Sequence, residues 1–406
     1  MTGVGKRLSP CRKAFALYGE RTDPLGASMA THPTDLGCSS YLVLPNIIRA
    51  RGYKSKRVNC RQRERKKLLI WQLRQTLFLW YTVLMHLKKT ALLLLVPWTA
   101  TALSLTRVCE LDRPPEPASL SSLTFVSNGT YWSSTDWKPV LYELKLKMSP
   151  EGVPAGVDVT RLCALEKATD VEGVARDPLR GTIWAADEIR KTVCEYDPST
   201  GRKLGKLEIP PIFRNCRKTF GFESLSIRAD GLEMWLANEE SLLCDGSVST
   251  PKIGSTVRIA RFTRVDGNSP WHPDGQWAYI CDSMAGSAPL DGCRSGLTSL
   301  CVLEDGTLLA LEREYSFKPL PSMRCRIYSI DRKDATDISA LESIAPGVNT
   351  FTPVAKNMLY DANTGFAIYE GMAPAPVEPD GSRLILLVSD GDKMMVKKLL
   401  VLRLKP

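Results

Sequence analysis

The chain has 406 residues, of which 44% are hydrophobic and 24% are charged, as in ordinary globular proteins. Its net charge of +10 is unevenly spread, because residues 1–84 hold 16 Lys and Arg against 4 Asp and Glu, whereas residues 85–406 hold 38 against 40. The main body is therefore nearly neutral, which argues against nucleic acid as a partner.

Residues 1–60 show no sustained period of strand or helix, and we expect residues 1–84 to be a basic, disordered extension, or the result of an upstream start codon wrongly chosen. A dense basic run, residues 57–67, precedes a mostly apolar stretch, residues 68–87. One interpretation is a cytoplasmic basic flank before a membrane anchor within residues 68–102. Arg74 would cost roughly 3 kcal/mol in the middle of such a span.

Residues 85–102 (MHLKKTALLLLVPWTATA) have a Met, a lysine pair, a short apolar core and an A-x-A sequence. This is the pattern of a secretory signal peptide. We therefore expect a mature domain at 103–406 that is secreted to the periplasm or the cell exterior. The alternative, a protein anchored to the membrane by residues 68–102, remains open.

Cysteine usage agrees with export. Of the 12 cysteines, nine lie between Cys109 and Cys325, and no two have the C-x-x-C spacing of a zinc or redox site. In an exported domain, this number predicts disulfide bonds with one thiol left over.

Residues 103–406 contain a repeated hairpin pattern. Each copy begins on a polar residue and has an apolar run after a turn, and the copies are Glu172–Glu188, Glu223–Glu239, Thr298–Glu314 and Glu370–Asp390. Further strand-like runs follow the copies, at Thr192–Tyr196, Thr256–Thr263, Cys325–Ile330 and Leu399–Leu404. Trp184 and Trp235 occupy matching positions inside the runs and are expected in the core.

Repeated units of three or four antiparallel strands predict an all-β fold, a β-propeller, with a pair of β-sandwiches as the competing architecture. At the usual 40–50 residues per blade, 300 residues give six or seven blades. We expect the C-terminal run Val396–Leu404 to pair near Leu141–Lys147, because ring closure removes exposed sheet edges.

Several short blocks resemble one family, the phytase-like esterases (esterase-like activity of phytase), over Asp136–Leu404. They are Glu172-Gly173, Phe222-Glu223-Ser224, Gly296-Leu297-Thr298 with Leu311-Glu312-Arg313, and Tyr369-Glu370-Gly371 with Ser389-Asp390. The resemblance implies a hydrolase of phosphate or carboxylic esters. The chain is also loosely similar to the gluconolactonase and regucalcin propellers, which implies a divalent metal bound by the Glu of Glu-Gly.

The first strand of each blade lines a propeller's central channel, so Glu172, Glu223 and Glu370 should converge. Carboxylates that crowd together demand a cation or raise one another's pKa. Ca²⁺ or another hard divalent cation is the expected cofactor, with Thr298 completing the ligand set. The alternative is that these glutamates accept backbone N–H bonds and hold the blades together.

The residues that close the repeats end the second strand, and we expect them at the other end of the channel or in loops above it. Among them, Glu312 and Arg313 are candidates for a phosphate or substrate contact, or for a stabilising ion pair. Glu223 and Glu370 are candidates for metal ligand or general base.

No G-x-S-x-G elbow or phosphate-binding loop occurs, and a catalytic triad would depend on His272 alone. Two functions therefore stay open. The first is a secreted, monomeric, metal-dependent hydrolase of small esters, which contacts membrane only through its N-terminal segment. The second is a non-catalytic extracellular binding module in which the central carboxylates are structural.

Overall fold

The computed structural model describes residues 103–285, 293–316, 322–391 and 395–406. In these residues the regular structure is strand, apart from one short 3-10 helix, η1 (Pro211–Asn215). The head, 1–84, and the signal segment, 85–102, lie outside the described residues. None of the described helices is both long enough and apolar enough to cross a membrane.

Twenty strands form five antiparallel sheets of four strands each. In chain order from the inner strand outward, blade 1 contains β2 (Thr124–Ser127), β3 (Thr130–Ser134), β4 (Val140–Met148) and β5 (Pro154–Ala164). Blade 2 contains β6 (Val171–Arg176), β7 (Ile183–Asp187), β8 (Thr192–Tyr196) and β9 (Lys203–Lys206). Blade 3 contains β10 (Phe222–Ile227), β11 (Glu233–Asn238), β12 (Thr256–Thr263) and β13 (His272–Ile280).

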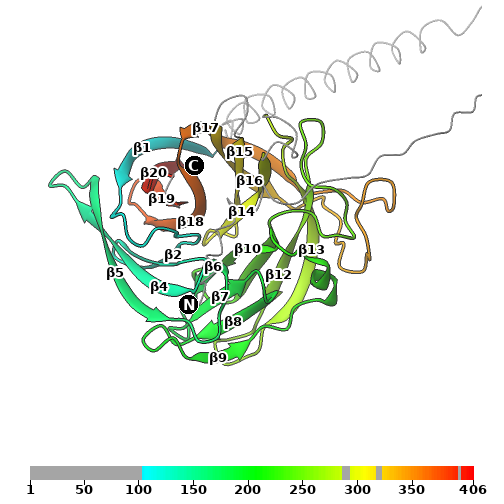
Figure 1. Ribbon diagram of the computed structural model, residues 1–406, viewed down its shortest axis with the longest axis horizontal. Coiled ribbons are helices and arrows are strands. Elements are labelled where there is room, and N and C mark those ends of the chain that lie inside the picture. The colour runs from blue at the N-terminus through cyan, green and yellow to red at the C-terminus, as the bar shows by residue number, and fades with distance from the viewer. Residues whose placement is uncertain (1–102, 286–292, 317–321, 392–394) are drawn as a thin grey trace, which may run out of the picture. The chain divides into compact units, whose positions relative to one another are not determined.

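Blade 4 contains β14 (Arg294–Val302), β15 (Leu308–Ser316), β16 (Ser322–Asp331) and β17 (Ala355–Gly365). Blade 5 contains β18 (Ile368–Val377), β19 (Arg383–Asp390), β20 (Lys398–Lys405) and, at its outer edge, β1 (Ser104–Asp112). The inner strands contact one another in the order β2, β6, β10, β14, β18 and back to β2. The fold is therefore the predicted β-propeller (Figure 1).

The blade number of six or seven that we predicted was wrong, because the propeller has five blades. The long spacing between the second and third repeats holds no further blade. It is taken up by the fourth strand β13 and by connections such as residues 239–255. The spacing before the fourth repeat likewise holds β17 and a long connection, residues 332–354.

Ring closure also differs from the prediction. The C-terminal strand β20 pairs with the N-terminal strand β1, from Ser104↔Lys405 to Asp112↔Lys398. Leu141–Lys147 lies instead within β4, between β3 and β5. The first and last strands of the described residues thus complete one sheet together, and the sequence from 103 to 112 showed no repeat that would have indicated this.

The predicted hairpins and third strands are confirmed. Gly181, Gly231, Gly306 and Gly381 have φ between 67° and 85°, the left-handed conformation that glycine adopts most readily in such turns. Trp184 packs in the core shared by blades 2 and 3, and Trp235 in the core shared by blades 3 and 4. Apolar side chains between neighbouring blades therefore hold the ring.

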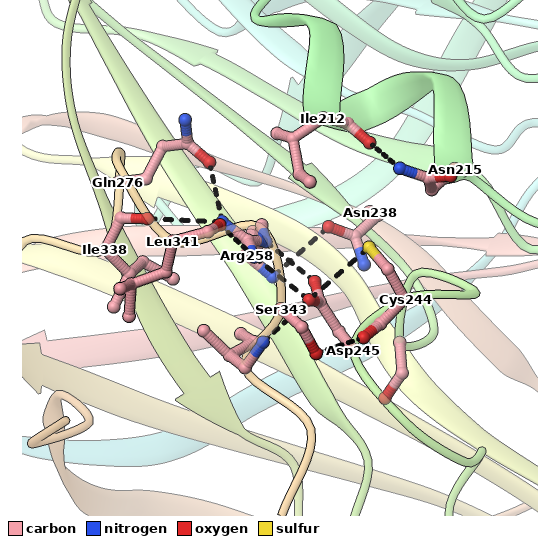
Figure 2. A network of polar contacts seen from close by, with 12 residues as sticks. Ile212, Asn215, Asn238, Cys244, Asp245, Arg258, Gln276, Ile338, Leu341 and Ser343 are labelled. Atoms are coloured by element: carbon pink, nitrogen blue, oxygen red, sulfur yellow. Dashed lines mark hydrogen bonds and ion pairs between the residues drawn. The ribbon is translucent and has the colours of Figure 1, made fainter. Parts of the chain in front are cut away.

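A buried ion pair fixes the long connection of blade 4 against blade 3 (Figure 2). The Arg258 guanidinium on β12 bonds to both carboxylate oxygens of Asp245, at 2.7 and 2.9 Å, and neither side chain is exposed. Arg258 also donates to the carbonyl oxygens of Ile338 and Leu341, and Asp245 accepts the N–H of Ile344. One charged pair thus holds a segment almost a hundred residues further along the chain.

All nine cysteines in the described part of the chain are free thiols, so the predicted disulfide bonds are not confirmed. Most of these cysteines are buried in the apolar cores: Cys163 and Cys194 share one, and Cys301 and Cys325 share another. Cysteine in such places packs as a small apolar side chain.

Candidate active site

The four residues that begin the repeats occupy equivalent places in the structure. Glu172, Glu223, Thr298 and Glu370 are each the extra, unpaired residue of a β-bulge on the inner strand of blades 2 to 5. A bulge locally bends a strand and redirects a side chain. The same backbone feature, a β-bulge, therefore orients a glutamate on each of three inner strands.

A small residue follows each bulge, because the neighbouring inner strand approaches closely there. A Cβ added to Gly173 would lie 3.0 Å from the Glu223 carbonyl oxygen, and one added to Gly371 would lie 2.5 Å from the Ser122 carbonyl carbon. The Glu-Gly pairs thus combine a redirected carboxylate with tight contact between blades.

Replacing Gly371 with Ala should lower the free energy of unfolding by about 1–3 kcal/mol, because the new methyl group would overlap the backbone of blade 1. Gly156→Ala on β5 is the matched control, since its Cβ would meet nothing closer than 3.7 Å. Urea unfolding of both variants tests this, and equal stabilities would contradict the packing described here.

The closing residues lie at the same end of the hairpins as the bulges, not at the opposite end as we predicted. In an antiparallel hairpin the start of the first strand faces the end of the second. Val171 pairs with Asp187, Phe222 with Asn238, Leu297 with Glu312 and Tyr369 with Ser389. The next residue in each blade completes a second set at this end: Glu188, Glu239, Arg313 and Asp390.

Six carboxylates therefore gather at one end of the inner hairpins, and we call them the axial carboxylates: Glu172, Glu188, Glu223, Glu239, Glu370 and Asp390. Blade 4 contributes Arg313 in their place. Its guanidinium forms ion pairs with Glu239 of blade 3 and Glu370 of blade 5. One cation thus joins three blades and forms ion pairs with two of the carboxylates.

The remaining axial carboxylates are poorly compensated. Burial, followed by the charge of Glu239, raises the pKa of Glu223 well above its usual range. Its Oε2 atom is buried without a hydrogen-bond partner. Burial raises the pKa of Glu188 to about 8, although the Gly221 N–H donates to it at 2.8 Å. Burial and the charge of Asp136 raise the pKa of Asp390 to about 7.

Two carboxylates that we did not predict lie beside Glu172. Asp136 follows β3 of blade 1, and Asp170 directly precedes β6. Oxygen atoms of Asp136, Asp170 and Glu172 all lie within 4.8 Å of one another, and the three residues are buried. Burial, then the charges of Asp136 and Asp170, raise the pKa of Glu172 well above its usual range. Asp136 belongs to no repeat copy, so only the Asp170-Val171-Glu172 alternation was visible in the sequence.

Two other candidates have partners within their own surroundings. The Thr298 hydroxyl donates to the Leu311 carbonyl of its own blade at 3.4 Å. The Glu312 carboxylate accepts from the Tyr279 hydroxyl, the Asp282 N–H and Lys356, at 2.6 to 2.9 Å. Glu312 thus belongs to a separate network, whereas its neighbour Arg313 joins the axial carboxylates.

A family model described as "Phytase-like: Esterase-like activity of phytase" matches residues 117–393. The chain belongs to the phytase-like family. The matched range includes all five inner strands and every axial carboxylate of this phytase-like chain, whereas the closing strands β1 and β20 lie outside it.

Solved structures are similar to the phytase-like chain only distantly. The PQQ-bound aldose sugar dehydrogenase of Streptomyces coelicolor has 12% identity and a TM-score of 0.37, over 75% of this chain and 98% of its own. A streptogramin B lyase has 10% identity and a TM-score of 0.32, over 75% and 98%. A putative exported protein of Bacteroides fragilis has 11% identity and a TM-score of 0.30, over 75% and 96%. No curated protein matches the chain.

Proposed function

We propose that this phytase-like protein is a secreted, metal-dependent hydrolase that cleaves phosphate or carboxylic esters at the axial carboxylates. The observation that carries the proposal is Glu223, whose Oε2 is buried without a partner among other carboxylates. An unpaired buried carboxylate costs stability unless a proton, a cation or a substrate compensates it. Strained electrostatics of this kind are typical of functional sites.

The residues present fit a hard divalent cation such as Ca²⁺. Such ions take oxygen ligands, carboxylates above all, and the axial end offers acidic oxygen atoms from blades 1, 2, 3 and 5. Glu172, Glu223 and Glu370, which the bulges present, are the candidate ligands expected from the sequence, whereas the Thr298 hydroxyl already donates to the Leu311 carbonyl of its own blade. Glu370 is the weaker donor of the three, because Arg313 already binds its Oε1.

A bound divalent cation would supply Lewis-acid polarisation of the ester oxygen and would favour ionisation of water. Glu223 would take the proton from the attacking water and return it to the leaving group, since its Oε2 is buried without a hydrogen-bond partner. Glu370 is the second candidate for this role; burial raises its pKa well above the usual range, although Arg313 acts in the opposite direction.

Arg313 would contact the substrate. Its two terminal nitrogens bind Glu239 and Glu370, which fix the guanidinium plane, and its Nε–H is buried without an acceptor among the described residues. A fixed guanidinium with a free donor suits a phosphate or a developing oxyanion. Glu312 contributes no such contact here, because its network lies with Lys356 and Tyr279.

The alternative function is a non-catalytic extracellular binding module. It is favoured by one observation, the Arg313 bridge between Glu239 and Glu370, which joins blades 3, 4 and 5 as a structural ion pair would. The proposed hydrolase acts as a monomer on a small ester, outside the cytoplasm, without nucleic acid and with membrane contact only through its N-terminal segment.

Replacing Glu223 with Gln should reduce ester turnover about 100-fold or more, because it removes a proton acceptor. The same change should leave the unfolding temperature equal or higher, since it removes a buried charge without a partner. Glu208→Gln, at an exposed position, is the control. Unchanged turnover in Glu223→Gln would favour the binding module. A parent protein without turnover, together with a lower unfolding temperature of Glu223→Gln, would favour it as well.

A further inference from the structure

The axial end is divided into two electrostatically different sides. On one side, Arg313 binds Glu239 and Glu370, so these carboxylates already have a cation. On the other side, Asp136, Asp170 and Glu172 bring oxygen atoms within 4.8 Å of one another; we call them the acidic triad. Each of the three side chains is at most 6% exposed. Water therefore compensates their charges poorly.

The backbone of the acidic triad is held in place by blades 1 and 2 together. The Val171 N–H donates to the Asp136 carbonyl at 3.1 Å, and Trp137 forms an isolated antiparallel bridge with Asp170. The Glu188 N–H donates to the Asp170 carbonyl at 2.8 Å. These bonds fix the segments that carry the three carboxylates, so the oxygen atoms are gathered before any ligand arrives.

Two side chains indicate that the site is built for a ligand. Among the described residues, the Glu172 carboxylate has neither a hydrogen bond nor an ion pair, although the side chain is buried in the triad. Glu223 is 7% exposed, its Oε2 has no partner, and Glu172 is among the charges that act on it. Buried acceptors without a donor call for a proton or a cation.

We propose that the acidic triad of Asp136, Asp170 and Glu172 is the cation site, with Ca²⁺ as its ion and Glu223 at its edge. The inference rests on the proposed function, because it assumes that the carboxylates at the axial end bind a divalent cation. It moves the ion away from Glu370, which Arg313 already binds, and toward blades 1 and 2. Oxygen atoms up to 4.8 Å apart can share an ion whose own bonds measure about 2.4 Å, as Ca²⁺ bonds do.

Glu223 interacts electrostatically both with Glu172 of the acidic triad and with Arg313. A substrate whose ester oxygen binds the ion would then present its remaining negative charge toward the guanidinium. The substrate class that suits such a site is an anionic ester, above all a phosphate monoester, rather than a neutral acyl ester.

Calcium titration calorimetry on the full chain tests the site. Asp136→Asn and Asp170→Asn should each weaken Ca²⁺ binding by ~10–100-fold or more. Loss of a group that only orients a metal ligand already costs this much, and these two residues would be ligands themselves. Glu312→Gln is the matched control, because it removes an equally buried carboxylate from a different network and should leave the affinity unchanged. Melting temperatures in chelator show whether each variant is folded.

Binding that survives both Asn variants, or a parent protein that binds no Ca²⁺, would overturn the inference. Binding lost only in Glu370→Gln would place the ion on the Arg313 side and would also overturn it. Calcium-dependent ester turnover that persists in Asp136→Asn would leave the proposed function standing without this site. Ca²⁺ bound at the triad with no ester turnover would support this site and contradict the proposed function.

Discussion

Replacing Asp245 with Ala should lower the free energy of unfolding by about 3–5 kcal/mol, because the Arg258 guanidinium would remain buried without its counter-charge. Neither side chain of this pair reaches solvent, so water cannot take the place of the lost carboxylate. The change would also release the Ile344 N–H, and with it one attachment of the long connection in blade 4.

Urea unfolding of Asp245→Ala measures this loss directly. The matched control is Asp158→Ala, which breaks the pair with Lys147 at 2.6 Å, where both side chains are more than half exposed. An exposed pair of this kind contributes about 0–1 kcal/mol. Similar losses in the two variants would mean that the Arg258 pair does not hold the connection as Figure 2 shows.

Without divalent cations, the melting temperature should fall as pH rises from about 5 to about 8. Burial raises the pKa of Glu188 to about 8 and that of Asp390 to about 7. The folded protein therefore keeps protons that the unfolded chain has already released in this pH range. Their stabilising contribution is complete below the ordinary carboxyl range and is lost as pH rises through the raised values.

The free energy of unfolding should fall by several kcal/mol over this range, since one pH unit of displacement corresponds to about 1.4 kcal/mol for each group. Differential scanning calorimetry in chelator across this pH range measures it. Millimolar Ca²⁺ should flatten the curve, because the ion takes over the role of the protons. Glu188→Gln should remove part of the fall while keeping an acceptor for the Gly221 N–H. A melting temperature that rises toward pH 8 in chelator would contradict the raised pKa values.

Much of the fold could be predicted because the repeat reflects one hairpin that is used again in several blades. Glu172, Glu223 and Glu370 could be matched with one another from sequence, since each precedes a small residue at an equivalent bulge. The blade number could not, because a long connection and a missing blade have the same effect on repeat spacing. The pairing of β1 with β20 could not be predicted either, because the sequence of an edge strand does not indicate which strand it pairs with.

The site could be predicted only where it follows the repeat. The hairpin of blade 4 is one residue shorter than that of blade 2, so Arg313, rather than Glu314, takes the place of Glu188 and Glu239. Asp136 comes from the segment after β3, which no repeat copy includes. Its approach to Glu172 depends on how blades 1 and 2 pack, and sequence periodicity carries no information about that.

The central claim is that the axial carboxylates hydrolyse an ester with the help of a divalent cation. The most direct measurement is the turnover of a phosphomonoester, an acyl ester and a lactone by the full chain, in Ca²⁺ and in chelator. We expect turnover of the phosphomonoester that requires the cation and is lost in Glu223→Gln. No turnover of any of the three, with Ca²⁺ present and the protein folded, would contradict the account.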